Sequence, residues 1–228
     1  MTRIKLCGLR RPADAKIANV FLPDYVGFVF AASPRQVSPT EAAEIAGALD
    51  PAIQRVGVFV NAEPEEVAAT VNAVGLDVAQ LHFDTTPEYL KRLKIALETA
   101  PKKKIGIWQR IAVPLDATDA PDVLKRIAGY PDLELFDALL LDVLTGKKDG
   151  GSGVPFPWEA GKKAALILRV KNPRIIVAGG IGAHNVKRAL EYFAPYAVDV
   201  SGSVETDGFK DEEKVAELIR AVREGIDA

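Results

Sequence analysis

The sequence predicts an α/β protein with one domain, residues 1–228, folded as a (β/α)8 (TIM) barrel. Eight apolar, strand-like runs alternate with segments of helical spacing along the whole chain. The runs are nearly continuous in apolar residues, as in parallel strands that are buried on both faces and covered by helices. A length of 228 residues is close to the roughly 250 of one such barrel, and eight units fit a closed barrel better than an open sheet.

The expected strands are short and rich in aliphatic residues. In chain order they are Arg3–Cys7, Tyr25–Phe30, Arg55–Val60, Asp77–Leu81, Lys104–Ile107, Ala138–Val143, Arg174–Ala178 and Ala197–Ser201. The expected helices are rich in Ala, Glu and Lys, and several begin at a proline, whose missing N–H does no harm in a first turn. These helices are Pro39–Leu49, Pro64–Val74, Pro87–Leu97, Asp122–Ile127, Trp158–Arg169, Ala183–Phe193 and Asp211–Arg223.

The composition argues against several classes of partner. With a formal net charge of -2, the chain lacks the cationic field that nucleic acid binding requires. No stretch approaches the roughly 18 apolar residues of a membrane span. One cysteine excludes an intramolecular disulfide, and the N-terminus has no signal-like apolar run, so we expect a cytoplasmic protein. We expect a small-molecule ligand, and both a monomer and a homodimer stay open.

The first strand carries the only cysteine to its last position. Side chains two apart share a strand face, so Lys5 and Cys7 point one way while Ile4 and Leu6 face a packed layer. An ammonium beside the thiol would lower the pKa of Cys7 from its reference of about 8.5, which suits a general base. The alternative is an inert core thiol, since free cysteine is among the most buried residues. Gly8 then permits a sharp exit and a close approach of the backbone to a ligand.

Asp142 ends the sixth expected strand, and the active sites of such barrels lie at the C-terminal ends of the strands. The first and sixth strands lie on roughly opposite sides of the barrel, so Cys7 and Asp142 would flank one ligand as proton acceptor and proton donor. Asp142 could instead cap the next turn.

Three further polar residues are candidates for ligand binding. Arg35, in the loop after the second strand, could clamp a carboxylate with its rigid fork or could be merely solvated. His82 follows the fourth strand and could contact ligand or make a structural hydrogen bond. Asp199 faces the barrel interior, where it needs a partner such as a sugar hydroxyl or an internal Arg or Lys. No His, Cys, Asp or Glu cluster has the spacing of a metal site.

Two late glycine loops favour phosphate over a simple turn. Gly179 and Gly180 follow the seventh strand, and Gly202 and Ser203 follow the eighth, where backbone N–H groups commonly hold a phosphate in these barrels. A longer glycine-rich loop, residues 144–157, follows Asp142. Loops of this length are usually lids, binding loops or disordered, so it could close over a substrate or be only a surface loop.

Matching segments across the whole chain resemble the phosphoribosylanthranilate isomerase family, ribulose-phosphate-binding barrels of the tryptophan pathway. The segments are Lys5-Leu6-Cys7-Gly8 with Asp14-Ala15, Val26-Gly27-Phe28-Val29-Phe30 through Ser33-Pro34-Arg35, Val56-Gly57-Val58-Phe59-Val60-Asn61, Gln80-Leu81-His82, Leu140-Leu141-Asp142 with Gly150-Gly151-Ser152-Gly153, Ala178-Gly179-Gly180 and Val198-Asp199-Val200-Ser201.

The resemblance implies an Amadori rearrangement of N-(5'-phosphoribosyl)anthranilate to 1-(2-carboxyphenylamino)-1-deoxyribulose 5-phosphate, without a cofactor. It implies Asp142 as general acid and Cys7 as general base. Arg35 would hold the anthranilate carboxylate, the two glycine loops the phosphate, and Asp199 a ribose hydroxyl. The open alternatives are a histidine-pathway or bifunctional phosphoribosyl isomerase, and a non-catalytic phosphosugar-binding barrel.

The chain departs from the family pattern at three places. Ser201-Gly202-Ser203-Val204-Glu205 replaces Ser-Ser-Gly-Val-Glu, which leaves individual phosphate contacts open. Phe83 replaces a glycine and is expected to put a bulky group near the rim. Arg10 and Arg11 replace neutral residues and are expected to add positive charge near the substrate.

Overall fold

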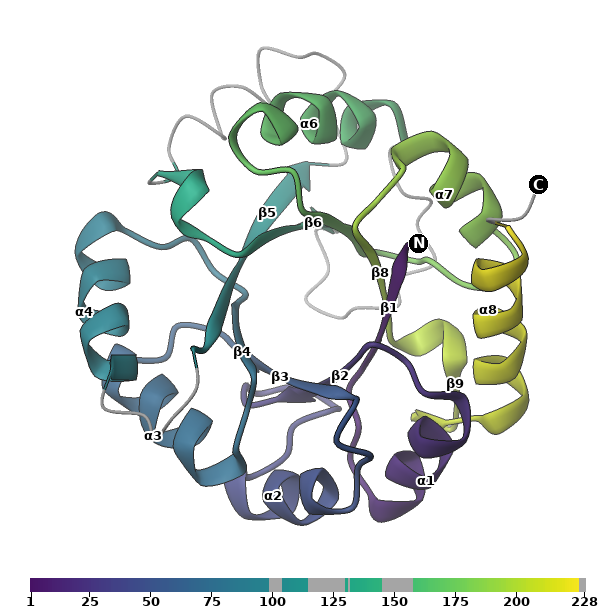
Figure 1. The fold of residues 1–228 in the computed structure, drawn as a ribbon, viewed down its shortest axis with the longest axis horizontal. Coiled ribbons are helices and arrows are strands. Elements are labelled where there is room, and N and C mark those ends of the chain that lie inside the picture. Colours follow the sequence, from purple (N-terminus) through teal and green to yellow (C-terminus); the bar gives the residue numbers. More distant parts are fainter. Residues whose placement is uncertain (99–103, 115–129, 131, 145–157, 226–228) are drawn as a thin grey trace.

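A computed structural model describes residues 1–98, 104–114, 130, 132–144 and 158–225, and confirms the predicted fold class. Eight parallel strands close into a barrel in sequence order, so that the last strand pairs with the first. Figure 1 looks along this barrel, with the helices as an outer ring. The strands are β1 (Arg3–Cys7), β2 (Tyr25–Val29), β3 (Gln54–Phe59), β4 (Val78–Leu81), β5 (Gly106–Pro114), β6 (Ala138–Leu144), β7 (Ile175–Val177) and β8 (Ala197–Val200).

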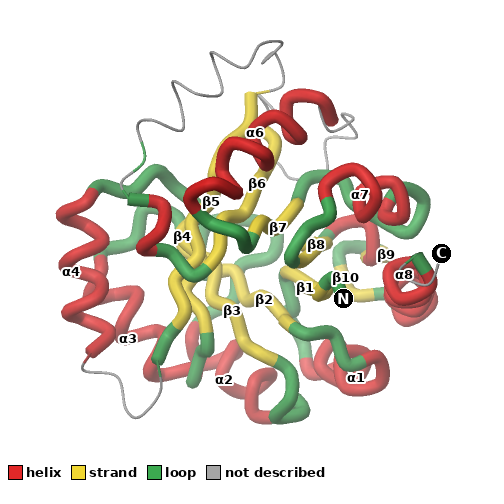
Figure 2. The backbone as a smooth tube through the Cα atoms, turned by 45° about the horizontal axis from the view of Figure 1, so that its top comes forward, coloured by secondary structure: helices red, strands yellow, loops and turns green. Residues whose placement is uncertain are grey.

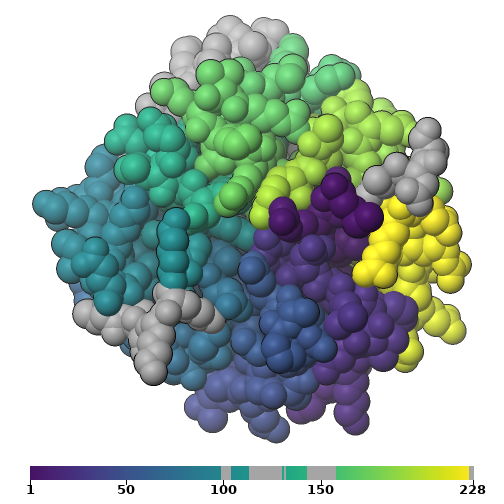
Figure 3. All heavy atoms as spheres, viewed as in Figure 1, coloured from purple at the N-terminus to yellow at the C-terminus, as the bar shows by residue number. Residues whose placement is uncertain are grey.

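Helices cover the outer face of the strands (Figure 2). They are α1 (Pro12–Phe21), α2 (Pro39–Gly47), α3 (Pro64–Val74), α4 (Pro87–Glu98), α6 (Trp158–Lys171), α7 (Val186–Phe193) and α8 (Glu212–Glu224), with short 3-10 turns η1 (Leu133–Leu135) and η2 (Gly202–Val204). A two-stranded hairpin, β9 (Glu205–Thr206) and β10 (Phe209–Lys210), follows η2. The ring of helices closes where α8 packs on α1, which brings the yellow and purple ends of the chain together in Figure 3.

The apolar side chains form two packed layers. Ile4 and Leu6 belong to the larger layer between strands and helices, as their strand face predicts. A smaller layer fills the barrel interior, where Trp108 packs edge-on against Tyr25 with ring centroids 4.9 Å apart. The interior layer separates the two ends of the barrel.

The largest differences from the sequence-based expectation concern β5, α1 and the β9–β10 hairpin, while the ends of other elements shift by at most three residues. β5 extends to Pro114 instead of ending at Ile107, because the polar Gln109 within it is fully buried but satisfied: its amide donates to the Phe83 carbonyl at 2.7 Å. α1 was not expected; it buries only three residues, and its short Ala-rich sequence gives a weak helical period. The β9–β10 hairpin was also not expected. The predicted helix Asp122–Ile127 and the loop after Leu144 lie outside the described residues.

Candidate active site

A cavity of about 790 Å³ opens at the C-terminal ends of the strands. Its wall includes every residue that the sequence singled out for catalysis or substrate binding: Cys7, Arg35, His82, Asp142, Gly179, Gly180, Asp199, Gly202 and Ser203. β1 and β6 are three strands apart around the barrel, through β8 and β7. Cys7 and Asp142 therefore line one cavity from well-separated strands.

A second, smaller cavity of about 340 Å³ lies at the opposite end of the barrel. Its carboxylates serve the backbone: Asp24 accepts from the Ile4 N–H at 2.9 Å, and Asp137 accepts from the Ile107 N–H at 2.9 Å. Such contacts tie each strand to the loop of its neighbour. This end of a barrel serves stability.

Lys5 and Asp199 form an ion pair beneath Cys7. The two residues are partners in the β1–β8 ladder, and Nζ of Lys5 lies 2.9 Å from each carboxylate oxygen of Asp199. The Lys5 side chain is fully buried. Burial acts to lower the pKa of Lys5, but Asp199 and Cys7 together outweigh it and the pKa is raised, so the ammonium stays charged. Of the partners expected for Asp199, the structure provides the internal lysine.

Cys7 is partly exposed to the cavity. Gly27, its partner on β2, makes room for the thiol, because a Cβ there would lie 2.9 Å from Sγ. Burial raises the pKa of the Cys7 thiol above its ordinary value, and the nearby Asp199 carboxylate adds to the rise. The Lys5 ammonium acts in the predicted direction, but it is the smaller effect. The predicted net lowering of this pKa is therefore wrong.

His82 lies between Asp142 and a buried amide. Its Nε2 is 3.3 Å from Oδ2 of Asp142, and its Nδ1 is 3.5 Å from Nε2 of Gln80. The His82 ring and the Asp142 carboxyl are both partly exposed, with side-chain exposures of 30% for His82 and 24% for Asp142. His82 is thus placed to orient the Asp142 carboxyl as well as to meet a ligand.

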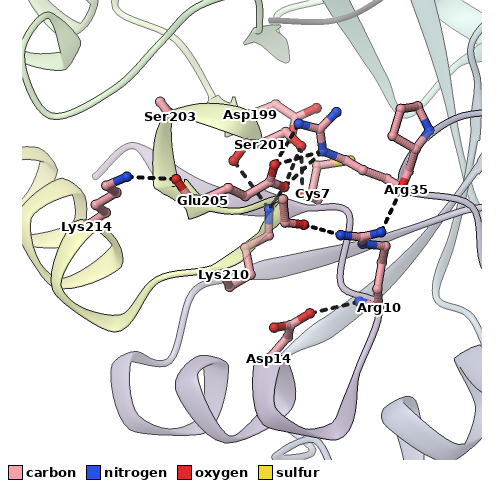
Figure 4. A network of polar contacts seen from close by, with 12 residues as sticks. Cys7, Arg10, Asp14, Arg35, Asp199, Ser201, Ser203, Glu205, Lys210 and Lys214 are labelled. Atoms are coloured by element: carbon pink, nitrogen blue, oxygen red, sulfur yellow. Dashed lines mark hydrogen bonds and ion pairs between the residues drawn. The ribbon is translucent and has the colours of Figure 1, made fainter.

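Arg35 reaches the cavity from the loop after β2 and is held by Glu205. Nε of Arg35 lies 2.9 Å from Oε1 of Glu205, and Nη2 lies 2.6 Å from Oε2 (Figure 4). The glycine at position 8 matters here: a Cβ on Gly8 would lie 2.6 Å from Cδ of Arg35. The close approach expected at Gly8 is therefore that of the Arg35 side chain.

The two late glycine loops touch each other. Gly179 and Gly180 have φ values of 89° and 69°, which favour glycine. A Cβ on Gly182 would lie 2.9 Å from Cβ of Ser203 in the following loop. The Ser203 hydroxyl donates to the Ile181 carbonyl at 2.5 Å, so this hydroxyl proton is not available to an anion. Backbone N–H groups of the loops remain for that purpose.

Of the three departures from the family pattern, Ser201-Gly202-Ser203 lines the cavity, whereas the side chains at the other two places do not. Phe83 packs edge-on against Tyr89, with centroids 5.2 Å apart, and does not line the cavity. Arg10 and Arg11 stack on the Phe209 ring at 4.4 and 4.1 Å, also outside the cavity lining. Neither place contributes to the cavity lining, and the expectations of a bulky group near the rim and of added charge near the ligand stay predictions.

Four polar residues of the site region were not singled out from the sequence as site residues. Gln80 and Arg110 line the cavity, while Glu205 and Lys210 lie behind Arg35. Gln80 could have been found from its spacing of two from His82, which puts both on one strand face. Arg110 lies in the part of β5 that the sequence did not predict, and Glu205 and Lys210 lie in the hairpin that was not expected.

The described residues contain no group of three or more metal-ligating side chains that could hold an ion. Within the same residues, every helix is too short or too polar to cross a bilayer.

The closed barrel, with a cavity at the strand C-termini that is lined by apolar as well as charged side chains, defines a (β/α)8-barrel enzyme. Residues 4–221 match the family model of N-(5'-phosphoribosyl)anthranilate (PRA) isomerase. The chain belongs to this family of isomerases of tryptophan biosynthesis, as the sequence predicted.

Relatives agree over nearly full length. The chain is 43% identical to N-(5'-phosphoribosyl)anthranilate isomerase of Acetivibrio thermocellus, over 98% of this chain and 97% of that protein. It is 41% identical to the Clostridium acetobutylicum enzyme over 98% of both chains. Among solved structures, phosphoribosyl anthranilate isomerase from Thermotoga maritima is 31% identical with a TM-score of 0.81, covering 98% of this chain and 100% of that one.

Proposed function

We propose that Asp142 is the general acid and Cys7 the general base of an Amadori rearrangement of N-(5'-phosphoribosyl)anthranilate. The observation that carries the proposal is the position of the two groups on the wall of one cavity, on strands three apart in the barrel. A proton donor and a proton acceptor can then act on different atoms of one sugar.

In the first step Asp142 donates a proton to the furanose ring oxygen. The C1'–O bond breaks, and the lone pair of the aniline nitrogen forms the iminium. The contact of 3.3 Å between His82 and Asp142 supports this role, since it fixes the carboxyl in the cavity. The nitrogen of the substrate supplies the electrons, so the proposal requires no cofactor and no metal.

In the second step the Cys7 thiolate removes the C2' proton. The C2'–H electron pair forms the C1'=C2' bond of an enolamine, and the iminium π electrons return to nitrogen. Tautomerisation of the enol to the ketone then gives the product. Burial raises the pKa of Cys7, and the Lys5 ammonium offsets part of that rise, which favours the thiolate that this step requires.

Substrate binding divides among three parts of the wall. Arg35 holds the anthranilate carboxylate, the loops with Gly179, Gly180, Gly202 and Ser203 hold the phosphate, and Asp199 accepts a hydrogen bond from a ribose hydroxyl. A related phosphoribosyl anthranilate isomerase, 29% identical with a TM-score of 0.77 over 98% of this chain and 100% of that one, was solved with reduced 1-(o-carboxyphenylamino)-1-deoxyribulose 5-phosphate. This relative supports a phosphosugar–anthranilate ligand, and His82 lies close enough to Asp142 to contact it.

We also propose that the chain acts in the cytoplasm as a single-domain enzyme, without nucleic acid or membrane partners. One related structure is of monomers generated from the dimeric phosphoribosylanthranilate isomerase of Thermotoga maritima, and this relative supports the homodimer over the monomer for this chain.

The deciding experiment follows the fluorescence of N-(5'-phosphoribosyl)anthranilate as the enzyme consumes it, beside a parallel assay with the histidine-pathway ribonucleotide. We expect turnover of the first substrate only. Turnover of both would make the enzyme bifunctional, and turnover of neither by folded protein would leave a binding barrel.

A further inference from the structure

We propose that Glu205 is a positioning residue that holds one edge of the Arg35 guanidinium, so that the other edge faces the cavity and binds the carboxylate of the substrate. The proposal deepens the proposed function and rests on it for the identity of that carboxylate.

The Arg35 guanidinium has two edges on which a carboxylate can bind. Glu205 occupies the edge formed by Nε and Nη2, with contacts of 2.9 and 2.6 Å. A guanidinium has five N–H donors, and Glu205 uses those on the Nε side. The N–H groups of Nη1 and the second N–H of Nη2 form the other edge, which Glu205 does not occupy. No residue in the described part of the chain accepts a hydrogen bond from Nη1. Since Arg35 lines the cavity, this remaining edge is suited to a second, bidentate carboxylate.

Glu205 is itself fixed by a buried cation. Nζ of Lys210 lies 2.7 Å from Oε1 of Glu205, and the side-chain exposures are 1% for Lys210 and 5% for Glu205. Burial acts to raise the pKa of Glu205, but the hydrogen bond from Arg35 and the charge of Lys210 outweigh it and hold this pKa below its ordinary value. Two cations around one carboxylate leave one net positive charge, which Arg35 presents to the cavity.

The β9–β10 hairpin explains why Glu205 and Lys210 lie in contact. Lys210 and Glu205 are opposite partners in the β9–β10 pair, and the turn between the strands is Asp207-Gly208 with φ values of 51° and 75°. Positive φ at both central residues is the mark of the two-residue turn that suits strand twist, and Asp-Gly favours it. Cross-strand pairing therefore fixes Lys210 against Glu205 independently of any ligand.

The Arg35 side chain has little room to turn away. A Cβ on Gly202 would lie 3.2 Å from Nη2 of Arg35, and one on Gly8 would collide with its Cδ. Arg10 donates to the Pro34 carbonyl at 2.6 Å and to the Gly208 carbonyl, which joins the loop before Arg35 to the hairpin turn (Figure 4). Close packing at Gly8 and Gly202 thus limits the movement of the Arg35 side chain, while Glu205 holds one edge of its guanidinium.

The effect of Glu205→Gln on carboxylate binding separates a role of Glu205 through its charge from a role in orienting Arg35. If Glu205 acted only through its charge, its removal would add one positive charge to the cluster and strengthen carboxylate binding. If it positions Arg35, the same change weakens carboxylate binding. The double variant Glu205→Gln/Lys210→Met keeps the net charge of the cluster at the wild-type value and also avoids an unpaired buried cation, so it protects folding.

The test measures binding of two probes by calorimetry: reduced 1-(o-carboxyphenylamino)-1-deoxyribulose 5-phosphate and the same compound without its ring carboxyl. We expect wild type to prefer the carboxylated probe, and both variants to lose about tenfold of that preference while the carboxyl-free probe binds as before. KM should rise in both variants with little change in kcat. Glu212→Gln, which removes an exposed carboxylate from the first turn of α8, is the charge-matched control and should behave as wild type.

An unchanged or stronger preference in folded variants would overturn the positioning role. An equal loss for both probes would also overturn it, since the effect would then be general to the cavity. Wild-type protein that binds and converts its substrate without any preference for the carboxyl would refute the Arg35 clamp and with it the role of Glu205. Wild-type protein that binds neither probe and turns over nothing would refute the proposed function itself.

Discussion

Lys5 and Asp199 face each other across the β1–β8 ladder, and the lysine Nζ lies 2.9 Å from both carboxylate oxygens. The pair joins the first strand to the last strand of the barrel, directly below the only cysteine. Because both side chains are nearly excluded from solvent, each is the main compensation for the charge of the other.

Removing the ammonium should make Cys7 harder to ionise. Burial already raises the pKa of this thiol and Lys5 opposes the rise, so Lys5→Met should move the pH midpoint of thiol alkylation further upward. Alkylation rates measured against pH would show it. Lys16→Met, an exposed change on α1, serves as the control, and superimposable profiles for all three proteins would contradict the electrostatic coupling.

Lys5→Met should also destabilise the fold by about 3–5 kcal/mol, because it leaves Asp199 buried without its cation. Lys5→Met/Asp199→Asn should regain much of that loss. The pKa of Lys5 is raised in the folded protein, so its contribution to stability is present in full below its unfolded pKa and is lost as the pH rises through the higher folded value. Urea unfolding of wild type between neutral and strongly alkaline pH would test the sign, and a stability that grows over this range would be the opposite result.

Loss of either proposed proton-transfer group should abolish turnover but spare binding. We expect Cys7→Ser and Asp142→Asn each to lower kcat by about 10²- to 10⁴-fold, the usual contribution of general acid–base catalysis. Affinity for the reduced product analogue should change little. Asp132→Asn, at an exposed carboxylate before η1, is the matched control. Folded Cys7→Ser protein with full activity would eliminate the proposed base.

Arg35→Ala should raise KM more than Arg35→Lys does, because lysine keeps the charge but loses the planar fork. We expect a rise of about 10- to 100-fold for alanine, the range for hydrogen bonds to charged groups. Steady-state kinetics on N-(5'-phosphoribosyl)anthranilate would measure both values. Small and equal effects of the two substitutions would count against the clamp.

Substitution by alanine should have opposite effects on stability at Gly57 and Gly47, neither of which has a positive φ. A Cβ on Gly57 would lie 2.5 Å from Cδ1 of Leu76, so Gly57→Ala should cost about 1–3 kcal/mol through overpacking. A Cβ on Gly47, at the end of α2, would have no heavy atom within 4 Å apart from its chain neighbours and the helix backbone around it, so Gly47→Ala should raise the free energy of unfolding by up to about 1 kcal/mol. Urea midpoints would show the difference, and a neutral Gly57→Ala would mean that the layer beneath it can relax.

Much of the architecture was predictable because it depends on local pattern. The alternation of apolar strands and proline-started helices gave the closed barrel, and the period of two within β1 placed Cys7 on the face that lines the cavity. β5 was predicted too short because Gln109 and Arg110 interrupt its apolar run. Gln109 can be buried because its hydrogen-bond partners lie in the loop after β4, and the sequence does not show this contact. α1 carried a usable signal in Pro12 and Asp14, but its buried face is too small to give a clear helical period.

The sequence by itself determined the strand that ends in Cys7, the strand that carries Asp142 and the glycines of the two late loops, because periodicity and backbone freedom are properties of neighbouring residues. Only the tertiary structure decided which charges meet. Lys5 and Asp199 are 194 positions apart and Arg35 and Glu205 are 170 apart, and they are brought into contact by closure of the barrel and by the hairpin after β8. The same closure leaves Cys7 only partly exposed, and this partial burial reversed the expected shift of its pKa, since burial depends on the layers packed around a side chain.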